Sequence, residues 1–154
     1  PWTYSDIVSA KYYSRGIIIN LGLDFTVGLC EMQPGNYDLT RMRAVRNLAT
    51  VMAGAKPINL PIEIETRATN IRSYSFSLSN GDKLIALWIE GIVVDNHPGI
   101  NATINVKSLY SPDVTGIDVL AGWQQPLVIA PGTGSLVIKN LIVRDYPLII
   151  KIKK

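Results

Sequence analysis

The spacing of apolar residues along the chain changes character near residue 55. Before that point the pattern predicts a helix, a short strand and a second helix, and beyond it the pattern predicts many short strands. The first helix is expected over residues 6–21, with Thr3 or Ser5 as its N-cap. Gly22 is expected in the left-handed position that ends the helix, because glycine adopts a positive φ without a steric penalty.

A second helix is predicted over residues 39–52, with Asp38 or Thr40 as its N-cap. Its apolar residues fall at steps of three and four, which places them on one face of a helix. They are Leu39, Met42, Val45, Leu48, Val51 and Met52. Gly54 is expected to end this helix, and Pro57 prevents it from resuming.

Between the two predicted helices lies the short apolar run Phe25–Cys30. A run of this length and composition predicts a strand that is covered on both faces, as in a parallel sheet. A helix, a buried strand and a second helix cannot pair the edges of that strand by themselves. We therefore expect the neighbouring strands to come from sequence upstream of Pro1 or from another chain, which would make this polypeptide part of something larger.

Beyond residue 57 the chain alternates between apolar and polar residues in short segments that turn residues separate. The pattern predicts about eight antiparallel strands in a β-sandwich, with a hairpin at Asn80-Gly81-Asp82. The expected strands cover residues 62–65, 73–78, 83–90, 102–106, 114–120, 127–129, 136–138 and 148–152. We accordingly divide the chain into two parts, residues 1–56 and residues 57–154, of which the second is a β-sandwich accessory domain.

Composition and charge exclude several classes of protein. Apolar residues make up 47% of the chain and charged residues 18%, which indicates a folded globular protein rather than a disordered one. The net charge is +3, but Lys and Arg are scattered, so no nucleic-acid partner is predicted. No apolar run reaches the roughly 18 residues of a membrane span, so no membrane partner is predicted.

Cys30 is the single cysteine, which excludes an intrachain disulfide. The start, Pro1-Trp2-Thr3, lacks an initiator Met and a signal-peptide pattern, and indicates a chain that has been cut or processed.

Six stretches, taken in order along the chain, resemble one known family. They are Ala10–Arg15 with Asn20–Gly22, Phe25–Glu31, Asn47–Gly54, Gly81–Trp88, Thr115–Leu120 and Leu141–Pro147. In this order they are similar to the C-terminal region of clan A glycoside hydrolases, in which a catalytic (β/α)8 barrel is followed by a small β-sandwich. The first three resemble the seventh helix, the eighth strand and the eighth helix of the barrel, and the others resemble strands of the sandwich.

The resemblance implies an α/β plus all-β fold, with the final helix-strand-helix of a (β/α)8 barrel over residues 1–56 and an antiparallel β-sandwich after it. It implies a retaining glycosidase as the parent enzyme, whose two catalytic glutamates end earlier barrel strands and therefore lie before Pro1. No catalytic residue and no cofactor are assigned in this chain, and the chain alone is expected to be inactive. The implied partners are the upstream barrel half and a carbohydrate. The alternative is a stand-alone carbohydrate-binding or structural β-sandwich, which leaves residues 1–54 unexplained.

Glu31 and Tyr37 are the candidate substrate-binding residues of the first part. Glu31 follows the predicted strand directly, at the end where barrel active sites are built. Its alternative role is a loop carboxylate in solvent or in a salt bridge with an arginine of the next helix. Tyr37 offers a ring for stacking on a sugar, and its alternative role is a turn residue packed on a domain interface.

Trp123 is the third candidate for carbohydrate binding, because it lies in a predicted turn between Gly122 and the polar stretch Gln124–Pro126. Its alternative role is a cap over the end of the sandwich. Trp88 lies within a predicted strand and is expected in the core. His97, the only histidine, lies in a turn composition, and a zinc site or a Ser-His-Asp triad would need it or a cysteine cluster, so neither is predicted.

Overall fold

A computed structural model describes residues 4–28, 39–130 and 134–154 of the protein. The described chain is mostly β, with two α-helices ahead of ten strands. The helices are α1 (Asp6–Gly22) and α2 (Thr40–Val51). The strands are β1 (Lys56–Ile58), β2 (Ile62–Thr66), β3 (Ile71–Ser77), β4 (Lys83–Ile89), β5 (Ile100–Lys107), β6 (Val114–Asp118), β7 (Gln124–Pro126), β8 (Ile129–Ala130), β9 (Ser135–Val143) and β10 (Leu148–Ile152).

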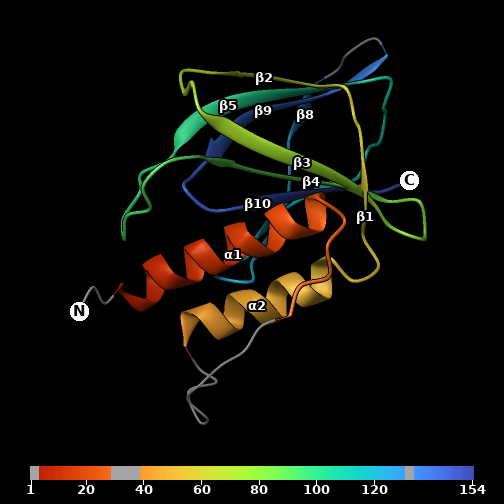
Figure 1. Ribbon diagram of the computed structural model, residues 1–154. Coiled ribbons are helices and arrows are strands. Elements are labelled where there is room, and N and C mark those ends of the chain that lie inside the picture. The colour runs from red at the N-terminus through yellow and green to blue at the C-terminus, as the bar shows by residue number, and fades with distance from the viewer. Residues whose placement is uncertain (1–3, 29–38, 131–133) are drawn as a thin grey trace.

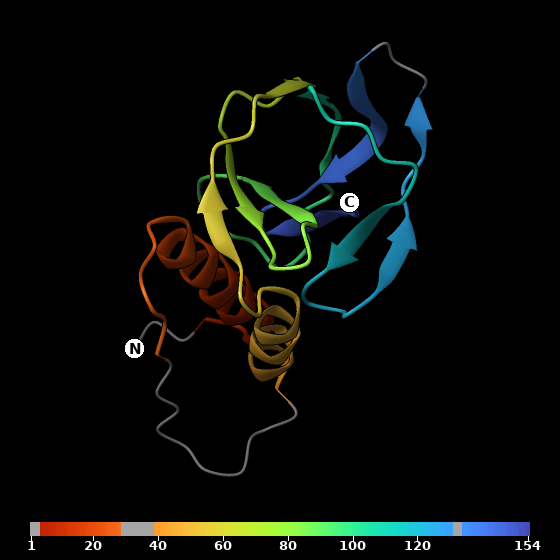
Figure 2. The same cartoon turned by 90° about the vertical axis from the view of Figure 1, so that its right-hand side faces the viewer.

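The strands form two antiparallel sheets that pack face to face, and the helices cover the outer face of the larger sheet (Figure 1). The larger sheet has six strands in the order β1-β3-β4-β10-β6-β7, and the smaller has four in the order β2-β5-β9-β8. In the view turned by 90°, both helices lie away from the four-stranded sheet (Figure 2). The molecule therefore has three layers, with the six-stranded sheet in the middle.

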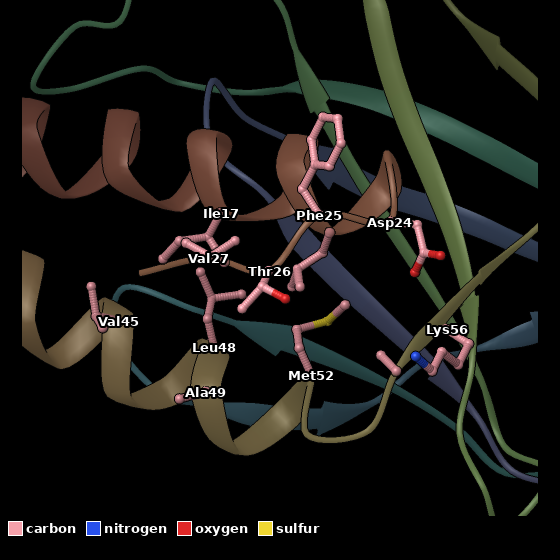
Figure 3. A pocket seen from close by; sticks show the side chains of 12 residues that line it. Ile17, Asp24, Phe25, Thr26, Val27, Val45, Leu48, Ala49, Met52 and Lys56 are labelled. Atoms are coloured by element: carbon pink, nitrogen blue, oxygen red, sulfur yellow. The ribbon is translucent and has the colours of Figure 1, made fainter. Parts of the chain in front are cut away.

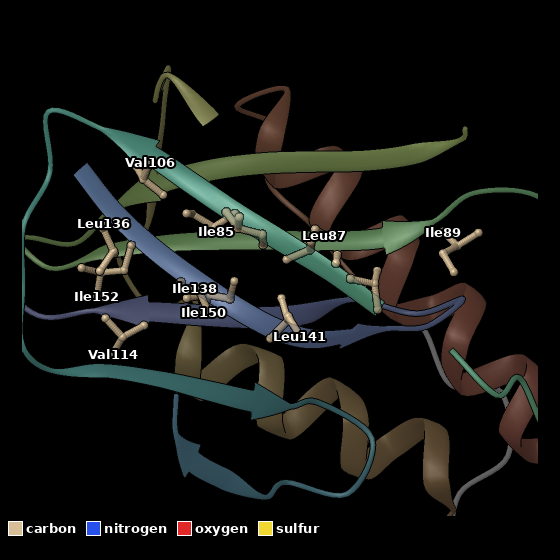
Figure 4. Close-up of a cluster of buried hydrophobic side chains, with 13 residues drawn as sticks. Ile85, Leu87, Ile89, Val106, Val114, Leu136, Ile138, Leu141, Ile150 and Ile152 are labelled. Carbon is tan, nitrogen blue, oxygen red and sulfur yellow. The ribbon is translucent and has the colours of Figure 1, made fainter. Parts of the chain in front are cut away.

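Strand β4 shows why the middle layer is apolar on both faces. Successive side chains of a strand point to opposite faces of its sheet. Leu84 and Trp88 belong to the apolar cluster under the helices, whereas Ile85 and Leu87 belong to the cluster between the two sheets, which Figure 4 shows from close by. The continuous apolar sequence of this strand is thus explained by burial on both sides, and the predicted core position of Trp88 is confirmed.

The predicted end of a (β/α)8 barrel is wrong. Residues 25–28, the described part of the expected strand Phe25–Cys30, belong to neither sheet, and Phe25 is 60% exposed. The two helices instead pack against each other and against a sheet built entirely from later residues (Figure 1). A short apolar run does not distinguish a strand from an extended segment that packs on helices. Here Val27 contributes to the cluster under the helices without any strand pairing.

Helix α1 begins as predicted and ends differently. The Ser5 hydroxyl accepts a hydrogen bond from the Val8 backbone nitrogen at 3.1 Å, which makes Ser5 the N-cap. Gly22 remains helical, and the residue with a positive φ after the helix is Asp24. A Cβ on Gly22 would lie 2.1 Å from Tyr74 Cδ1, so this glycine serves the close approach of the helix to β3 rather than a left-handed turn.

The N-terminus of α2 is capped by a residue of α1. Neither predicted N-cap is observed among the described residues: Leu39 holds the position and makes no capping bond, and Asp38 lies outside the described residues. The Asp6 carboxylate instead accepts hydrogen bonds from the backbone nitrogens of Thr40 at 2.6 Å and Arg41 at 3.4 Å. Burial acts to raise the pKa of Asp6, but these hydrogen bonds outweigh it and lower the pKa below its usual range.

A buried ion pair fastens α1 to the loops at one end of the larger sheet. Lys11 Nζ lies 2.8 Å from Asp145 Oδ1, and it also donates to the Val94 carbonyl at 2.6 Å. The other carboxylate oxygen of Asp145 accepts a hydrogen bond from the Val94 nitrogen at 2.9 Å. One turn along the helix, Arg15 donates to the Asp145 carbonyl at 3.0 Å and to two carbonyls at the end of β4, each at 2.7 Å. We call this set the α1 clasp.

Candidate carbohydrate-binding groove

Of the three predicted site residues, Trp123 is the one that falls within the described residues. Glu31 and Tyr37 lie outside them, and their roles stay predictions. Trp123 lies in the turn between β6 and β7, as expected, and it is 77% exposed. An exposed indole offers a flat apolar face and one hydrogen-bond donor to a ligand.

Trp123 borders a groove of about 760 Å³ that links the edges of the two sheets. One wall comes from the β6–β7 hairpin and the segment after it, and the other comes from β9 and the loop that follows it. The polar and charged side chains of the lining are Asp118, Gln124, Gln125, Lys139, Asn140 and Arg144. We call this hollow the Trp123 groove.

The turn that carries Trp123 is held by Asp118. The Asp118 carboxylate accepts hydrogen bonds from the nitrogens of Leu120 at 2.9 Å and Ala121 at 3.0 Å. The backbone of Asp118 closes the same turn, because its nitrogen donates to the Trp123 carbonyl at 2.9 Å and its carbonyl accepts from the Gly122 nitrogen at 2.8 Å. The indole is therefore presented by a backbone that is ordered before any ligand arrives.

Gly122 is required in this turn for two reasons. Its φ is +75°, a conformation that side chains rarely adopt, and a Cβ there would lie 3.1 Å from Asn47 Nδ2. Asn47 itself donates a hydrogen bond to the Val119 carbonyl at 2.8 Å, so helix α2 supports the turn from below. The position of the indole thus depends on both the hairpin and the helical layer.

The second oxygen of Asp118 accepts a hydrogen bond from the Tyr146 hydroxyl at 2.8 Å. Burial raises the pKa of this tyrosine, and the neighbouring Asp118 charge raises it further, because a phenolate beside a carboxylate is unfavourable. Tyr146 therefore acts as a fixed donor. Asp118 uses its carboxylate to hold the turn and the tyrosine together, which is a structural task at the edge of the groove.

The opposite wall of the groove contains a β-bulge that the sequence analysis missed. Ala102 pairs with Leu141 but Ile104 pairs with Ile138, so Lys139 and Asn140 stand opposite a single residue of β5. Asn140 has a φ of +57°, which asparagine tolerates better than most residues. The bulge places both Lys139 and Asn140 on the exposed side of β9, along the groove.

The signal for this bulge is present in the sequence. The buried residues of β9 are Leu136, Ile138, Leu141 and Val143. Their spacing is two, three and two, and the step of three breaks the strict alternation of a regular strand. The inserted pair is polar, as expected for residues that leave the core face.

His97 lies in the β4–β5 loop, as predicted, and its Nδ1 accepts a hydrogen bond from the Gly99 nitrogen at 3.0 Å. Among residues 4–28, 39–130 and 134–154, no cluster of three metal-ligating side chains occurs. Neither described helix has the length and apolar character needed to cross a bilayer.

A second hollow, of about 580 Å³, lies between the two helices and the segment that follows α1 (Figure 3). Apolar side chains of both helices line it, among them Ile17, Leu48 and Met52, together with Phe25 and Val27. We call it the helix groove. Asp24, Thr26 and Lys56 add polar groups at its margin.

The chain was also compared with known proteins. A scan against family models gave no match, and a search of curated proteins gave no significant match.

Proposed function

We propose that this chain is a noncatalytic, carbohydrate-binding part of a glycoside hydrolase, and that sugar binds in the Trp123 groove. The observation that carries the binding proposal is the 77% exposure of Trp123 at the rim of a groove that also holds two side-chain amides, Gln124 and Gln125. The assignment to a glycoside hydrolase is supported by the ordered resemblance of the last three sequence stretches to the appended β-sandwich of that family, because the barrel end that the first three resemble is not formed by the described residues.

The chemistry of a sugar ring suits this groove. A pyranose has one face of C–H bonds, which packs on an aromatic face, and a rim of hydroxyl groups, which both donate and accept hydrogen bonds. The indole of Trp123 offers the first contact, and the amides of Gln124 and Gln125 offer donors and acceptors for the second. The ordered turn lowers the entropy lost on binding.

Trp123→Ala is expected to weaken oligosaccharide binding about tenfold or more, because it removes the large aromatic surface on which a sugar ring would stack. Isothermal titration of the 154-residue chain with neutral and acidic oligosaccharides would measure this. The unfolding free energy should change little, since the ring is exposed. Tyr110→Ala is a matched control, because Tyr110 is 76% exposed and does not line the groove.

Two results would contradict the proposal. Equal loss of affinity in both variants would show that binding is not located at the Trp123 groove. Release of reducing sugar by the purified chain would show that the chain is itself catalytic.

A catalytic part of such an enzyme needs a surface on which to pack, and we assign that surface to the helix groove. The support is the set of apolar side chains that both helices contribute to its lining, together with the exposure of Phe25 at 60% and of the nearby Leu23 at 56%. Apolar side chains gathered at one site are typical of an interface.

Phe25→Asp is expected to weaken packing of the catalytic part on this chain. When the protein is isolated from its source, we expect native mass spectrometry to find the chain in an assembly with a catalytic part, either covalently linked to it or noncovalently bound. The substitution should lower the thermal midpoint of that assembly by several degrees and leave the isolated chain nearly unchanged. Ile92→Asp is the control, because Ile92 is 86% exposed on a loop that does not line the helix groove. A free monomer in the native extract would contradict the packing proposal.

A further inference from the structure

The charges along the Trp123 groove are unequal. Two cationic side chains, Lys139 and Arg144, line it together with one carboxylate, that of Asp118. The Asp118 carboxylate already accepts three hydrogen bonds, from two backbone nitrogens and the Tyr146 hydroxyl. This carboxylate can therefore accept few further hydrogen bonds from a ligand's hydroxyl groups. The charged groups that remain available to a ligand are mainly hydrogen-bond donors.

Lys139 differs from the lysines that hold the fold together. Lys11, Lys107 and Lys153 each form an ion pair with an acidic side chain. Within residues 4–28, 39–130 and 134–154, Lys139 has no acidic side chain within ion-pair distance, and it is exposed on the groove side of the β9 bulge. Because Ile138 points into the core, alternation along a regular strand would already place residue 139 on the outer face of β9. The bulge adds Asn140 to the same face, so two adjacent polar residues line this side of the groove.

We infer that the Trp123 groove binds anionic oligosaccharides, those with uronate carboxylates or sulfate esters, and that Lys139 is the residue that selects them. This inference rests on the proposed carbohydrate-binding function. A sugar ring stacks on Trp123 while its anionic substituent meets Lys139, and Arg144, whose side chain also lies beside the Tyr146 hydroxyl, adds positive charge to the groove. Hydrogen bonds between charged partners are about twice as strong as those between neutral ones, so the acidic sugar gains where a neutral sugar does not.

A nucleic acid is also anionic and also stacks on aromatic rings, but the groove fits it less well. A bound polynucleotide needs a track of several cations along its backbone. The groove offers two, together with the Asp118 carboxylate. Spaced charges on a sugar chain suit this arrangement better.

The test compares four probes of matched length: oligogalacturonate, a sulfated glucan oligosaccharide, a neutral glucan oligosaccharide and oligothymidylate. Affinities are measured by titration of the 154-residue chain in low salt. We expect at least one acidic glycan to bind at least tenfold more tightly than the neutral glycan, and the two acidic probes decide between carboxylate and sulfate. Lys139→Gln should remove most of this preference by weakening binding of the acidic glycans far more than binding of the neutral glycan, and Lys139→Glu should reverse it. High salt should reduce the preference, because the charges are near the surface.

Lys107→Gln is the control, because Lys107 is an exposed lysine that does not line the groove. Equal affinity for neutral and acidic glycans, or a preference that Lys139→Gln leaves intact, would overturn the inference while the carbohydrate-binding proposal stands. Oligothymidylate that binds as tightly as the acidic glycans would also overturn it. Absence of binding to every glycan would contradict the proposed function itself.

Discussion

Replacing Lys11 with methionine is expected to lower the free energy of unfolding by about 3–5 kcal/mol, because the Asp145 carboxylate then stays buried without its cation. The side chains of Lys11 and Asp145 are only 3% and 2% exposed. Arg15 remains nearby, but its hydrogen bonds go to backbone carbonyls, so it does not replace the contact with the carboxylate. Urea unfolding followed by circular dichroism would measure the loss as a lower midpoint with an unchanged slope.

Two variants separate the buried charge from other effects of this substitution. Lys107→Met breaks an exposed ion pair with Glu63, in which both side chains are 54% exposed, and it should cost roughly 0–1 kcal/mol. Lys11→Met combined with Asp145→Asn should recover part of the loss, because neither remaining group is charged. If Lys11→Met cost no more than Lys107→Met, the α1 clasp would not stabilise the helix on the sheet.

Trp88→Ala is expected to destabilise the chain by about 3–5 kcal/mol, since it empties the largest buried position under the helices. The Trp88 ring is fully buried and stacks on Tyr74, with ring centroids 5.9 Å apart. Tyr74 in turn packs against Gly22 at the end of α1. Loss of the indole therefore leaves Tyr74 without its stacking partner at the contact between α1 and β3.

Trp88→Phe distinguishes the loss of volume from the loss of a polar contact. Among the described residues, Trp88 Nε1 is buried without a hydrogen-bond partner. Phenylalanine keeps a ring next to Tyr74 and removes this unsatisfied donor, so it should cost less than half as much as alanine. Unfolding midpoints of the three proteins in urea give the comparison. If the phenylalanine variant were as unstable as the alanine variant, a hydrogen bond from Nε1, and not packing of the ring, would account for the contribution of Trp88 to stability.

The elements with a strong periodic pattern could be predicted from the sequence. Helix α1 was expected over residues 6–21 and is observed over Asp6–Gly22, and β10 has the predicted bounds. Each has a local cause: a serine that caps a helix start, or an apolar run bounded by turn residues. The turn position of Trp123 was also predicted, because the glycine before it and the Gln-Gln-Pro after it indicate a turn.

The parts that could not be predicted depend on partners distant in the sequence. Asp6 caps α2, which begins 34 residues later, and Lys11 pairs with Asp145, 134 residues later. Nothing near either residue indicates its partner. The apolar run at Phe25 was predicted to be a buried strand, but its described residues join neither sheet, and every strand of both sheets comes from later residues. Whether a short apolar segment pairs as a strand is decided by the edges that the rest of the chain leaves open.

The sequence by itself determined the positions of both helices, of most strands and of the turn that carries Trp123, because these follow from local sterics and side-chain spacing. Only the tertiary structure decided that the helices cover the six-stranded sheet, that the clasp holds α1, and that Lys139 and Trp123 line the same groove. Those arrangements depend on burial and hydrogen bonding between residues far apart in the chain, and such contacts leave no local pattern.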